Sequence, residues 1–350
     1  MRTPVQSLTS LTPWRHWLLL ICMCTLLGAR PASAVQTVAA SYESEPGVRI
    51  AATLELPAAT PGKRWPAVVL AVGAGKWGRG WYVALRSRLH AAGVATLSYD
   101  KRGFGESTGA FDESLPLVSR DIAAGVNFLR SRADIDGQRI ALLGHSQGAA
   151  GLPLAAATVG GIAGIVMLQA PIGARGEVFG DGMQKSLTQS GMPADTARPI
   201  VAATLAWLEA RTQRLPATEI DRLREAAITA FVAAGMPPEG ARGTVQSLDN
   251  TMVLSMYDAP LAQDLIRSGS PVLAVYGGTD TVVSAEVCAP MATRALNQHP
   301  NALVLVVPGM NHGMQRLDPV PAPKAGELLE DTMPPRMVEA VAHWLSERLR

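Results

Sequence analysis

The sequence is poor in the residues that mark several classes of protein. It has three cysteines, an aromatic content of 5% and almost no excess charge, since 31 Lys and Arg residues stand against 29 Asp and Glu residues. A nucleic-acid-binding protein normally carries a basic face or stripe, and no such run is visible. The 33 glycines and 25 prolines follow no fixed period and no internal repeat is visible, which excludes collagen-like, solenoid and low-complexity architectures.

Cysteine is too scarce for a disulfide framework or a metal centre. Cys22 and Cys24 lie in the N-terminal segment 1–34, and only Cys288 lies beyond that segment. The remaining chain can therefore form no internal disulfide. Cys and His residues with the spacing of metal ligands are also missing. We expect neither a disulfide nor a metal site.

Residues 1–34 have the features of a secretory signal peptide. Basic residues precede an apolar run at 17–29, and small residues follow at 32–34, in the order of such a signal and its cleavage site. The run is too short for a comfortable membrane span. We predict cleavage after Ala34 and a secreted or periplasmic protein without stable membrane insertion; an uncleaved anchor is the alternative. Cleavage removes three arginines and no acidic residue, so the formal charge changes from +2 to −1.

The rest of the chain alternates short runs rich in Val, Ile and Leu with longer segments of helical period. This alternation is typical of α/β proteins with a mostly parallel sheet. With 48% hydrophobic and 17% charged residues, the chain can bury one sizeable core or a core with an accessory lobe. Strands are predicted at 37–44, 49–57, 67–73, 95–100, 139–144, 164–170, 271–277 and 302–307, and core helices at 80–92, 119–132, 148–158, 284–297 and 331–349.

One connection, between the sixth and seventh predicted strands, is far longer than the others. It has about a hundred residues, whereas such links usually take a few turns of helix. Helical apolar spacing at 194–213 and 218–235 indicates that the link is helical. We predict a cap over the carboxyl edge of the sheet; a helical layer against the side of the sheet is the alternative. The predicted organisation is a core of residues 35–173 and 263–350 with a helical cap at 174–262.

The pattern Gly-x-Ser-x-Gly occurs twice, at 105–109 and at 144–148. A serine nucleophile on such a pattern needs a buried strand before it, a sharp turn and a helix after it, so that backbone N–H groups face the developing oxyanion. Ser146 has this context, since an apolar strand precedes it and a helical segment follows. Ser107 lies in a glycine-rich loop well past the preceding strand. We predict Ser146 as the nucleophile and Ser107 as a loop residue.

A serine nucleophile needs a histidine base, and the base needs a carboxylate that fixes its tautomer. Asp280 and His312 each follow the end of a predicted buried strand, in the chain order Ser, Asp, His that an α/β-hydrolase requires. We predict Asp280 and His312 as the partners of Ser146. The rival histidines are His16, His90, His145, His299 and His343, of which His145 is predicted to pack, and the rival acids are Asp258 and Asp318.

From about residue 40 to its end the chain resembles the α/β-hydrolase superfamily. The run SYDKRGFGES at 98–107, together with GHSQG at 144–148, is similar to the branch of secreted esterases and serine aminopeptidase-like enzymes. The resemblance implies a mostly parallel eight-stranded sheet flanked by helices, with a helical cap. It also implies that Asp100, Arg102 and Glu106 order a loop through a buried ion-pair network.

The resemblance implies an oxyanion hole made of two backbone N–H groups. One belongs to Gln147, directly after the nucleophile, and the other to the loop 73–77 after the third strand. Alignment with the Gly-x-Gly turn of the family selects Ala74, with a tight structural turn as the alternative. The His-Gly-Gly loop of many lipases is missing here.

These residues predict a secreted serine hydrolase that cleaves carboxylic esters through an acyl-enzyme and needs no cofactor. We expect it to bind a small-molecule ester as substrate and not to bind nucleic acid. The sequence does not predict the oligomeric state. A serine peptidase or amidase on the same three residues is the first alternative, and a non-catalytic binding protein of the same fold is the second. A peptidase would hold a free amino terminus with an acidic pair. The acids of the cap considered for this role can also be explained as a solvated helix face; they are Glu177, Glu209, Glu219, Asp221 and Glu225.

The cap also carries apolar residues that bear on the substrate. At helical spacing most of them should form the core of the cap, and those that face the cleft would make the acyl pocket apolar. We therefore expect a preference for short or medium acyl esters. The residues are Met183, Met192, Trp207, Leu208, Phe231, Met236, Met252 and Met256.

Overall fold

A single sheet organises the protein. The computed structural model describes residues 35–57, 62–316 and 333–350, and eight strands within them pair in the order β1-β2-β4-β3-β5-β6-β7-β8. The strands are β1 (Gln36–Glu45), β2 (Val48–Leu56), β3 (Trp65–Ala71), β4 (Ala95–Tyr99), β5 (Ile135–His145), β6 (Ile165–Leu168), β7 (Val272–Gly277) and β8 (Ala302–Val307). The strand β2 is antiparallel to both β1 and β4, and all other neighbours are parallel. The predicted α/β fold with a mostly parallel eight-stranded sheet is confirmed.

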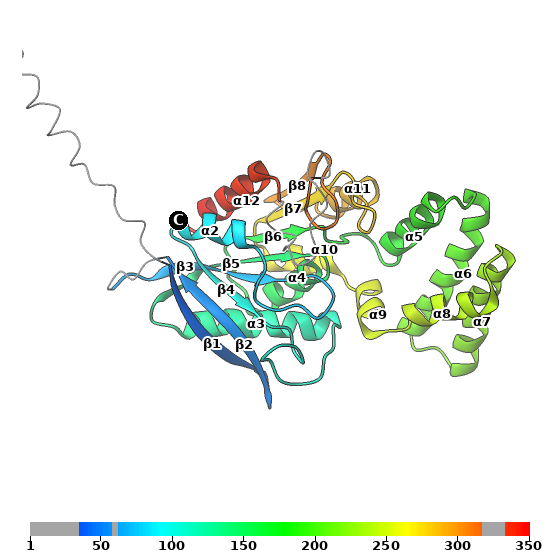
Figure 1. The fold of residues 1–350 in the computed structure, drawn as a ribbon, viewed down its shortest axis with the longest axis horizontal. Coiled ribbons are helices and arrows are strands. Elements are labelled where there is room, and N and C mark those ends of the chain that lie inside the picture. Colours follow the sequence, from blue (N-terminus) through cyan, green and yellow to red (C-terminus); the bar gives the residue numbers. More distant parts are fainter. Residues whose placement is uncertain (1–34, 58–61, 317–332) are drawn as a thin grey trace, which may run out of the picture. The chain divides into compact units, whose positions relative to one another are not determined.

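Helices cover both faces of this sheet (Figure 1). One face packs against α3 (Leu115–Ser131), α4 (Gln147–Val159), α10 (Leu261–Ser268) and α11 (Ala285–Ala295). The opposite face packs against α2 (Val83–Ala91) and α12 (Pro335–Arg348). Parallel strands need crossover connections, and here α2, α3, α4, α10 and α11 lie in these connections, while α12 follows the last strand.

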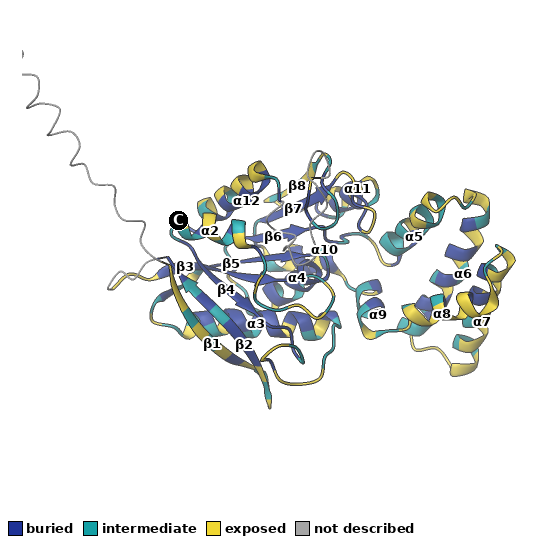
Figure 2. Ribbon diagram, in the orientation of Figure 1, coloured by how far each residue is buried: buried dark blue, intermediate teal, exposed yellow. Residues whose placement is uncertain are grey.

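The central strands are apolar on both sides because both faces of the sheet are covered. Every residue of β3 is buried. Its alternate residues Ala67 and Val69 belong to one hydrophobic cluster, and Val68 and Leu70 belong to the other, as the two-residue period of a strand requires. Figure 2 shows the same burial along the middle of the sheet. The sheet therefore forms a rigid support for the loops at its edge.

Residues between β6 and β7 form a set of helices with a hydrophobic cluster of its own. The helices are α5 (Glu177–Gln189), α6 (Ala194–Thr212), α7 (Ala217–Ala233), α8 (Pro238–Leu248) and α9 (Thr251–Tyr257). Trp207, Leu208 and Phe231 are at the centre of this cluster, with Met192, Met236 and Met252 packed around them. Most of the apolar residues considered for the substrate cleft thus fill the space between these helices.

Two hydrogen bonds show where these helices contact the rest of the protein. Lys185 Nζ of α5 donates to Ser284 Oγ at the start of α11, over 2.7 Å. Thr251 Oγ1 of α9 donates to Asp112 Oδ1, just before α3, over 3.1 Å. Both α3 and α11 begin after strands that run in the parallel direction, so both contacts lie at the carboxyl edge of the sheet.

The predicted signal peptide lies outside the described residues. Among the residues that are described, no helix combines the length and the apolar character that crossing a membrane requires.

Candidate active site

Ser146 occupies a sharp turn between β5 and α4. Its backbone has φ 53° and ψ −124°, a conformation that a non-glycine residue rarely adopts and that tends to occur at functional sites. The Ser146 N–H donates to the Leu168 carbonyl of β6 over 2.8 Å, which fixes the turn to the sheet. The strand, turn and helix expected around this serine are all present.

The two glycines beside Ser146 are required by space. A Cβ atom at Gly148 would lie 2.3 Å from the Val72 carbonyl oxygen. A Cβ atom at Gly144 would lie 2.8 Å from the Ala149 nitrogen. Because both obstacles are backbone atoms, neither can move aside easily. The pattern Gly-x-Ser-x-Gly therefore allows α4 to start close against both β5 and the end of β3.

The loops after β7 and β8 bring an acid and a base to this turn. His312 Nε2 lies 3.1 Å from Ser146 Oγ, and His312 Nδ1 lies 2.8 Å from Asp280 Oδ2. The Asp280 side chain is fully buried, and its other oxygen accepts the N–H groups of Val282 and Val283 over 2.7 and 2.9 Å. A carboxylate held by two amides can orient the imidazole and stabilise its protonated form.

Two backbone N–H groups beside Ser146 are free to bind an anion. The segment of Ala74 lies close to the serine, since a Cβ atom on Gly73 would be 3.4 Å from Ser146 Cβ. Within the described part of the chain, neither the Ala74 N–H nor the Gln147 N–H donates to a protein acceptor. These are the two groups expected to form an oxyanion hole. Unused donors next to a nucleophile can stabilise a tetrahedral intermediate without reorganising.

His145, predicted only to pack, also supports the base. Its Nε2 lies 2.7 Å from the His312 carbonyl oxygen, and since a carbonyl only accepts, Nε2 carries the proton. Burial and the neighbouring His312 lower the pKa of His145 to about 4. The ring is therefore neutral at neutral pH and anchors the His312 backbone without adding charge.

Gln169, which the sequence analysis did not single out, links the acid loop to the base loop. Its side-chain amide donates to the Asn311 carbonyl over 2.8 Å, and its oxygen accepts the Gly277 N–H over 2.8 Å. The Thr279 N–H donates to the Met310 carbonyl over 3.0 Å in the same region. These bonds fix the separation between the segments that carry Asp280 and His312.

Comparison with known proteins agrees with this fold. The chain matches the model of the group described as the alpha/beta hydrolase family over residues 68–323, which is well over half of its length. The protein belongs to the alpha/beta hydrolase family. Curated relatives are less informative: an uncharacterized 31.7 kDa protein of the traX-finO intergenic region of Escherichia coli is 43% identical over 58 residues, or 16% of this chain. That match spans only 20% of the relative.

Solved structures with the same fold are distant in sequence. A hypothetical protein of Pseudomonas aeruginosa has a TM-score of 0.55 and 19% identity, with 91% of this chain and 95% of that chain covered. A Pyrococcus furiosus esterase has a TM-score of 0.52 and 16% identity, with 89% and 93% covered. The protein Est1E of Butyrivibrio proteoclasticus has a TM-score of 0.50 and 18% identity, with 89% and 98% covered.

Ser107, the serine of the second pattern, has a different setting in this alpha/beta hydrolase. Its hydroxyl donates to the Asp100 carbonyl over 2.7 Å and accepts the Ala51 N–H over 2.9 Å. The residue is 8% exposed. Ser107 therefore holds its loop against β2, and its oxygen is already engaged.

Asp100, Arg102 and Glu106, predicted to share one ion-pair network, belong to two separate groups. Asp100 is buried and pairs with Arg79 over 3.0 Å, and Arg79 also contacts the exposed Glu106. Arg102 is buried with Asp121 in a second group, in which the Nη2 to Oδ1 distance is 2.7 Å. Hydrogen bonds to Asp121 raise the pKa of Arg102.

Except for His145, whose ring contacts His312, the rival acids and bases that the structure describes lie apart from the three aligned residues. His90 contacts Thr96, His299 is buried near the start of β8, and His343 is exposed on α12. Asp258 pairs with Arg175. His16 and Asp318 lie outside the described residues.

The structure offers little sign of thiol or metal chemistry in the described part of the chain. Burial raises the pKa of Cys288 to about 12, which keeps this thiol protonated and unreactive. Over the same described residues, His, Cys, Asp and Glu side chains form no cluster of the kind that could hold a metal ion.

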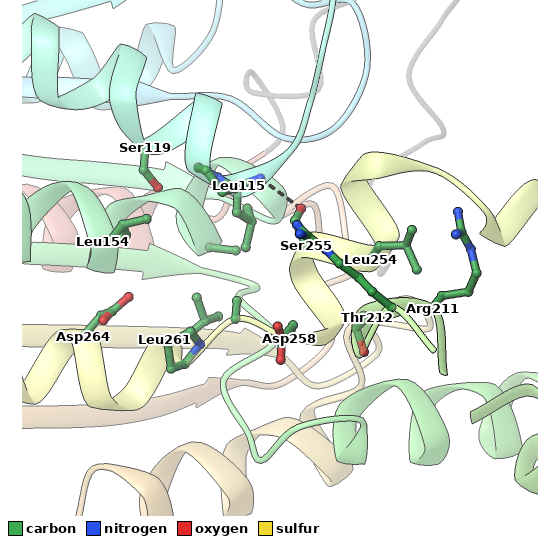
Figure 3. A pocket seen from close by; sticks show the side chains of 15 residues that line it. Leu115, Ser119, Leu154, Arg211, Thr212, Leu254, Ser255, Asp258, Leu261 and Asp264 are labelled. Atoms are coloured by element: carbon green, nitrogen blue, oxygen red, sulfur yellow. Dashed lines mark hydrogen bonds between the residues drawn. The ribbon is translucent and has the colours of Figure 1, made fainter. Parts of the chain in front are cut away.

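A pocket of about 430 Å³ lies where α9 and α10 meet α3 and α4 (Figure 3). Its lining includes Leu115, Ala150 and Leu261, but none of the residues assigned above to the nucleophile, acid, base or oxyanion hole. The Leu115 N–H donates to Ser255 Oγ of α9 over 3.0 Å. The helix α9, near the end of the helical insertion, is thus bonded to the first residue of α3.

Proposed function

We propose that this member of the alpha/beta hydrolase family is a serine hydrolase of carboxylic esters. The observation that carries the proposal is the hydrogen-bonded chain Ser146, His312 and Asp280, with two unused N–H donors beside the serine. This set contains a nucleophile, a base, an orienting acid and an anion site, which together are sufficient for acyl transfer. A binding protein would need none of these alignments.

The reaction follows from the positions of these groups. Ser146 Oγ attacks the ester carbonyl while His312 Nε2 takes its proton, and the oxyanion forms between the N–H groups of Ala74 and Gln147. His312 then protonates the leaving alcohol, and a water molecule activated by the same imidazole hydrolyses the acyl-enzyme. Asp280 accepts the hydrogen bond from the Nδ1–H group of His312 and holds the imidazole in place throughout. No cofactor takes part in these steps.

The acids of the helical insertion favour an ester over a peptide with a free amino terminus. Each of the five acids considered above is paired with an arginine, so these five do not form an open acidic pair. The pairs are Glu177 with Arg294, Glu209 with Arg175, Glu219 with Arg222, and both Asp221 and Glu225 with Arg224. The Pyrococcus furiosus neighbour is named an esterase, which is consistent with this choice.

The helices of residues 174–262 act in this proposal as a cap that shapes the acyl side of the cleft. Support comes from their bonds to the starts of α3 and α11, at the edge of the sheet that also carries Ser146 and Asp280. An apolar cleft under such a cap would give about 0.8 kcal/mol for each methylene group it buries, until the cleft is full. The substrate is accordingly an ester with a short or medium acyl chain.

The enzyme is further proposed to be exported, with residues 1–34 removed. N-terminal sequencing of protein recovered from the medium or periplasm tests this. A sequence beginning at Val35 is expected, and recovery of material that begins at Met1 would contradict removal of the signal.

A substrate panel tests the ester assignment. We expect kcat/KM for p-nitrophenyl esters to rise from acetyl to a short or medium acyl chain and then to fall, while aminoacyl p-nitroanilides are much poorer substrates. Ser146→Ala should remove the ester activity, and Ser131→Ala, at the exposed end of α3, should leave it intact. Anilide turnover equal to that of the best ester would assign the protein to the peptidases and amidases instead.

A further inference from the structure

A buried ion pair beside the candidate oxyanion hole has no part in the steps described above. Lys101 and Glu113 have side chains that are 7% and 15% exposed, and Lys101 Nζ lies 2.6 Å from Glu113 Oε1. Burial lowers the pKa of Lys101, while Glu113 opposes this shift. Removing both charges from water is costly, so a buried pair of this kind contributes little net stability unless other groups use it. The contacts of the pair show which groups these are.

The ammonium group of Lys101 uses all three of its donors. Besides Glu113, it donates to the Gly73 carbonyl over 2.5 Å and to Gln147 Oε1 over 2.9 Å. The first contact is to the loop after β3, and the second is to the first residue of α4. Lys101 therefore joins the two segments that carry the two free N–H groups.

The contact with Gly73 determines where the Ala74 N–H points. Gly73 C=O and Ala74 N–H belong to one peptide unit, and in a trans peptide these two groups point in opposite directions. Since the carbonyl is held by Lys101, the N–H is directed away from Lys101 and into the space beside Ser146. A cation on the carbonyl also polarises the peptide, which strengthens its N–H as a donor.

Glu113 fixes the next peptide unit and the other segment. Its Oε1 accepts the Gly75 N–H over 2.7 Å, and its backbone carbonyl accepts the Gln147 side-chain amide over 2.6 Å. The Gly75 N–H is thereby used, and the Trp77 N–H donates to the Gly75 carbonyl over 3.1 Å. In the loop 73–77 these bonds use the Gly75 and Trp77 N–H groups, while the Ala74 N–H has no protein acceptor among the described residues.

We propose that Lys101 and Glu113 are positioning residues that orient the Ala74 N–H and hold it at a fixed distance from the Gln147 N–H. The inference deepens the proposed function and rests on it, because the donors matter only if Ser146 forms an oxyanion. Neither residue touches the substrate. They stabilise the transition state, in which the negative charge develops, and have little influence on substrate binding.

Lys101→Met tests the inference, because methionine keeps the length of the side chain and removes the donors. Loss of one oxyanion donor costs about 100- to 1000-fold in kcat, so misorientation of Ala74 should lower kcat about 10- to 100-fold with KM nearly unchanged. The affinity for a trifluoromethyl ketone, whose serine adduct carries an oxyanion, should fall by a similar factor.

Arg102→Met is the matched control. Arg102 is the next residue in the chain and is also buried in an ion pair, but its partners Asp121 and Glu45 lie away from Ala74 and Gln147. This variant should lower the melting temperature while the folded protein keeps its kcat and its affinity for the ketone. An equal loss of kcat in both variants would overturn the inference, because the loss would then follow from removing any buried ion pair of this loop and not from the contacts of Lys101 with Gly73 and Gln147.

Glu113→Asp serves as a second variant where Lys101→Met does not fold. It keeps the negative charge near Lys101 but withdraws the carboxylate from the Gly75 N–H, so kcat and ketone affinity should again fall together. Wild-type values of both quantities in folded Lys101→Met or Glu113→Asp would overturn the positioning role alone. A wild-type protein whose Ser146 does not react with a fluorophosphonate would overturn the proposed function and this inference together.

Discussion

The two Gly-x-Ser-x-Gly segments of this chain share a pattern and differ in almost everything else. In 144–148 the serine has a strained backbone, lies 3.1 Å from a histidine nitrogen and is followed by an unused N–H. In 105–109 the serine hydroxyl is used in two hydrogen bonds that hold a loop on β2. The pattern alone does not predict a nucleophile; the proposed role of Ser146 rests also on the strand before it and the helix after it.

The glycines of the two segments also serve different purposes. Those beside Ser146 permit close packing of backbone on backbone, because a side chain at either position would meet main-chain atoms. Gly105 and Gly109 have φ values of 58° and 89°, so they permit turns that other residues rarely adopt. One segment is built for tight packing around a reactive group, and the other for a bent loop.

The largest difference is expected when each serine is replaced. Ser146→Ala removes the attacking oxygen and should lower kcat on the order of 10,000-fold or more. Ser107→Ala leaves the nucleophile, base and anion site in place, so its folded fraction should keep most of the activity. Initial rates with the best ester of the panel, corrected for the folded fraction by circular dichroism, measure both. Equal losses in two folded variants would remove the distinction between the segments.

The glycine after each serine gives the next contrast. In Gly148→Ala the new Cβ would meet the Val72 carbonyl oxygen at 2.3 Å, and we expect a loss of roughly 3 kcal/mol or more in the free energy of unfolding. In Gly109→Ala the nearest atoms are Val48 methyl groups at 3.2 Å, which can shift, so about 1 kcal/mol is expected for the positive φ. Urea unfolding compares the two. A smaller loss in Gly148→Ala would contradict the packing argument.

The residue before each serine should make the segments respond differently to pH. Burial lowers the pKa of His145 to about 4 in the folded protein, below the ordinary value of about 6.5 for the unfolded chain. The unfolded state then binds more protons between these values, so stability falls as the pH falls through this window, by up to about 3 kcal/mol.

The control for this pH effect is a comparison of variants. The difference in unfolding free energy between wild type and His145→Gln should change between pH 7 and pH 4, whereas His343→Gln, at an exposed site on α12, should produce no such change. Glu106, the residue before Ser107, is 70% exposed and gives the second segment no comparable burial. A pH-independent difference for His145→Gln would contradict a neutral buried imidazole.

The smallest expected effect is on stability, where Ser107→Ala should cost more than Ser146→Ala. Ser107→Ala leaves the Ala51 N–H and the Asp100 carbonyl without their buried partner and should cost about 2 kcal/mol of stability. Ser146→Ala removes a hydroxyl that bonds only to the partly exposed His312, so its stability should change far less. Thermal unfolding of both variants at pH 7 gives the comparison. A larger loss of stability in Ser146→Ala would show that the turn depends on its hydroxyl.

Much of the fold could be predicted because the buried strands are strongly apolar. The predicted strand at 302–307 coincides with β8, but β8 is the edge strand of the sheet and none of its residues is buried, so its prediction as a buried strand was wrong. The other predicted strands differ from the observed ones mainly at their ends. Asp280 and His312 could be selected because each follows an apolar strand, and parallel strands bring their carboxyl ends together. The helices α5, α8, α9 and α10 were not predicted individually; they have 13, 11, 7 and 8 residues, so each contains few apolar repeats.

The supporting contacts could not be predicted from local pattern. Lys101 occurs in the loop motif at 98–107, but no pattern predicted its role. Its partner Glu113 belongs to no motif. Gln169 is similar, since its role depends on Gly277 and Asn311, more than a hundred residues away in sequence. Such bonds form only when several loops, far apart in the sequence, are placed next to one another. Local sequence patterns do not predict that placement.

Mass spectrometry after reaction with a fluorophosphonate is the most direct test of the central claim that context alone separates the two serines. The account predicts one adduct per chain, on the peptide that contains Ser146, with the adduct lost in Ser146→Ala and retained in Ser107→Ala. An adduct on Ser107, or a folded wild-type protein that forms no adduct, would contradict it.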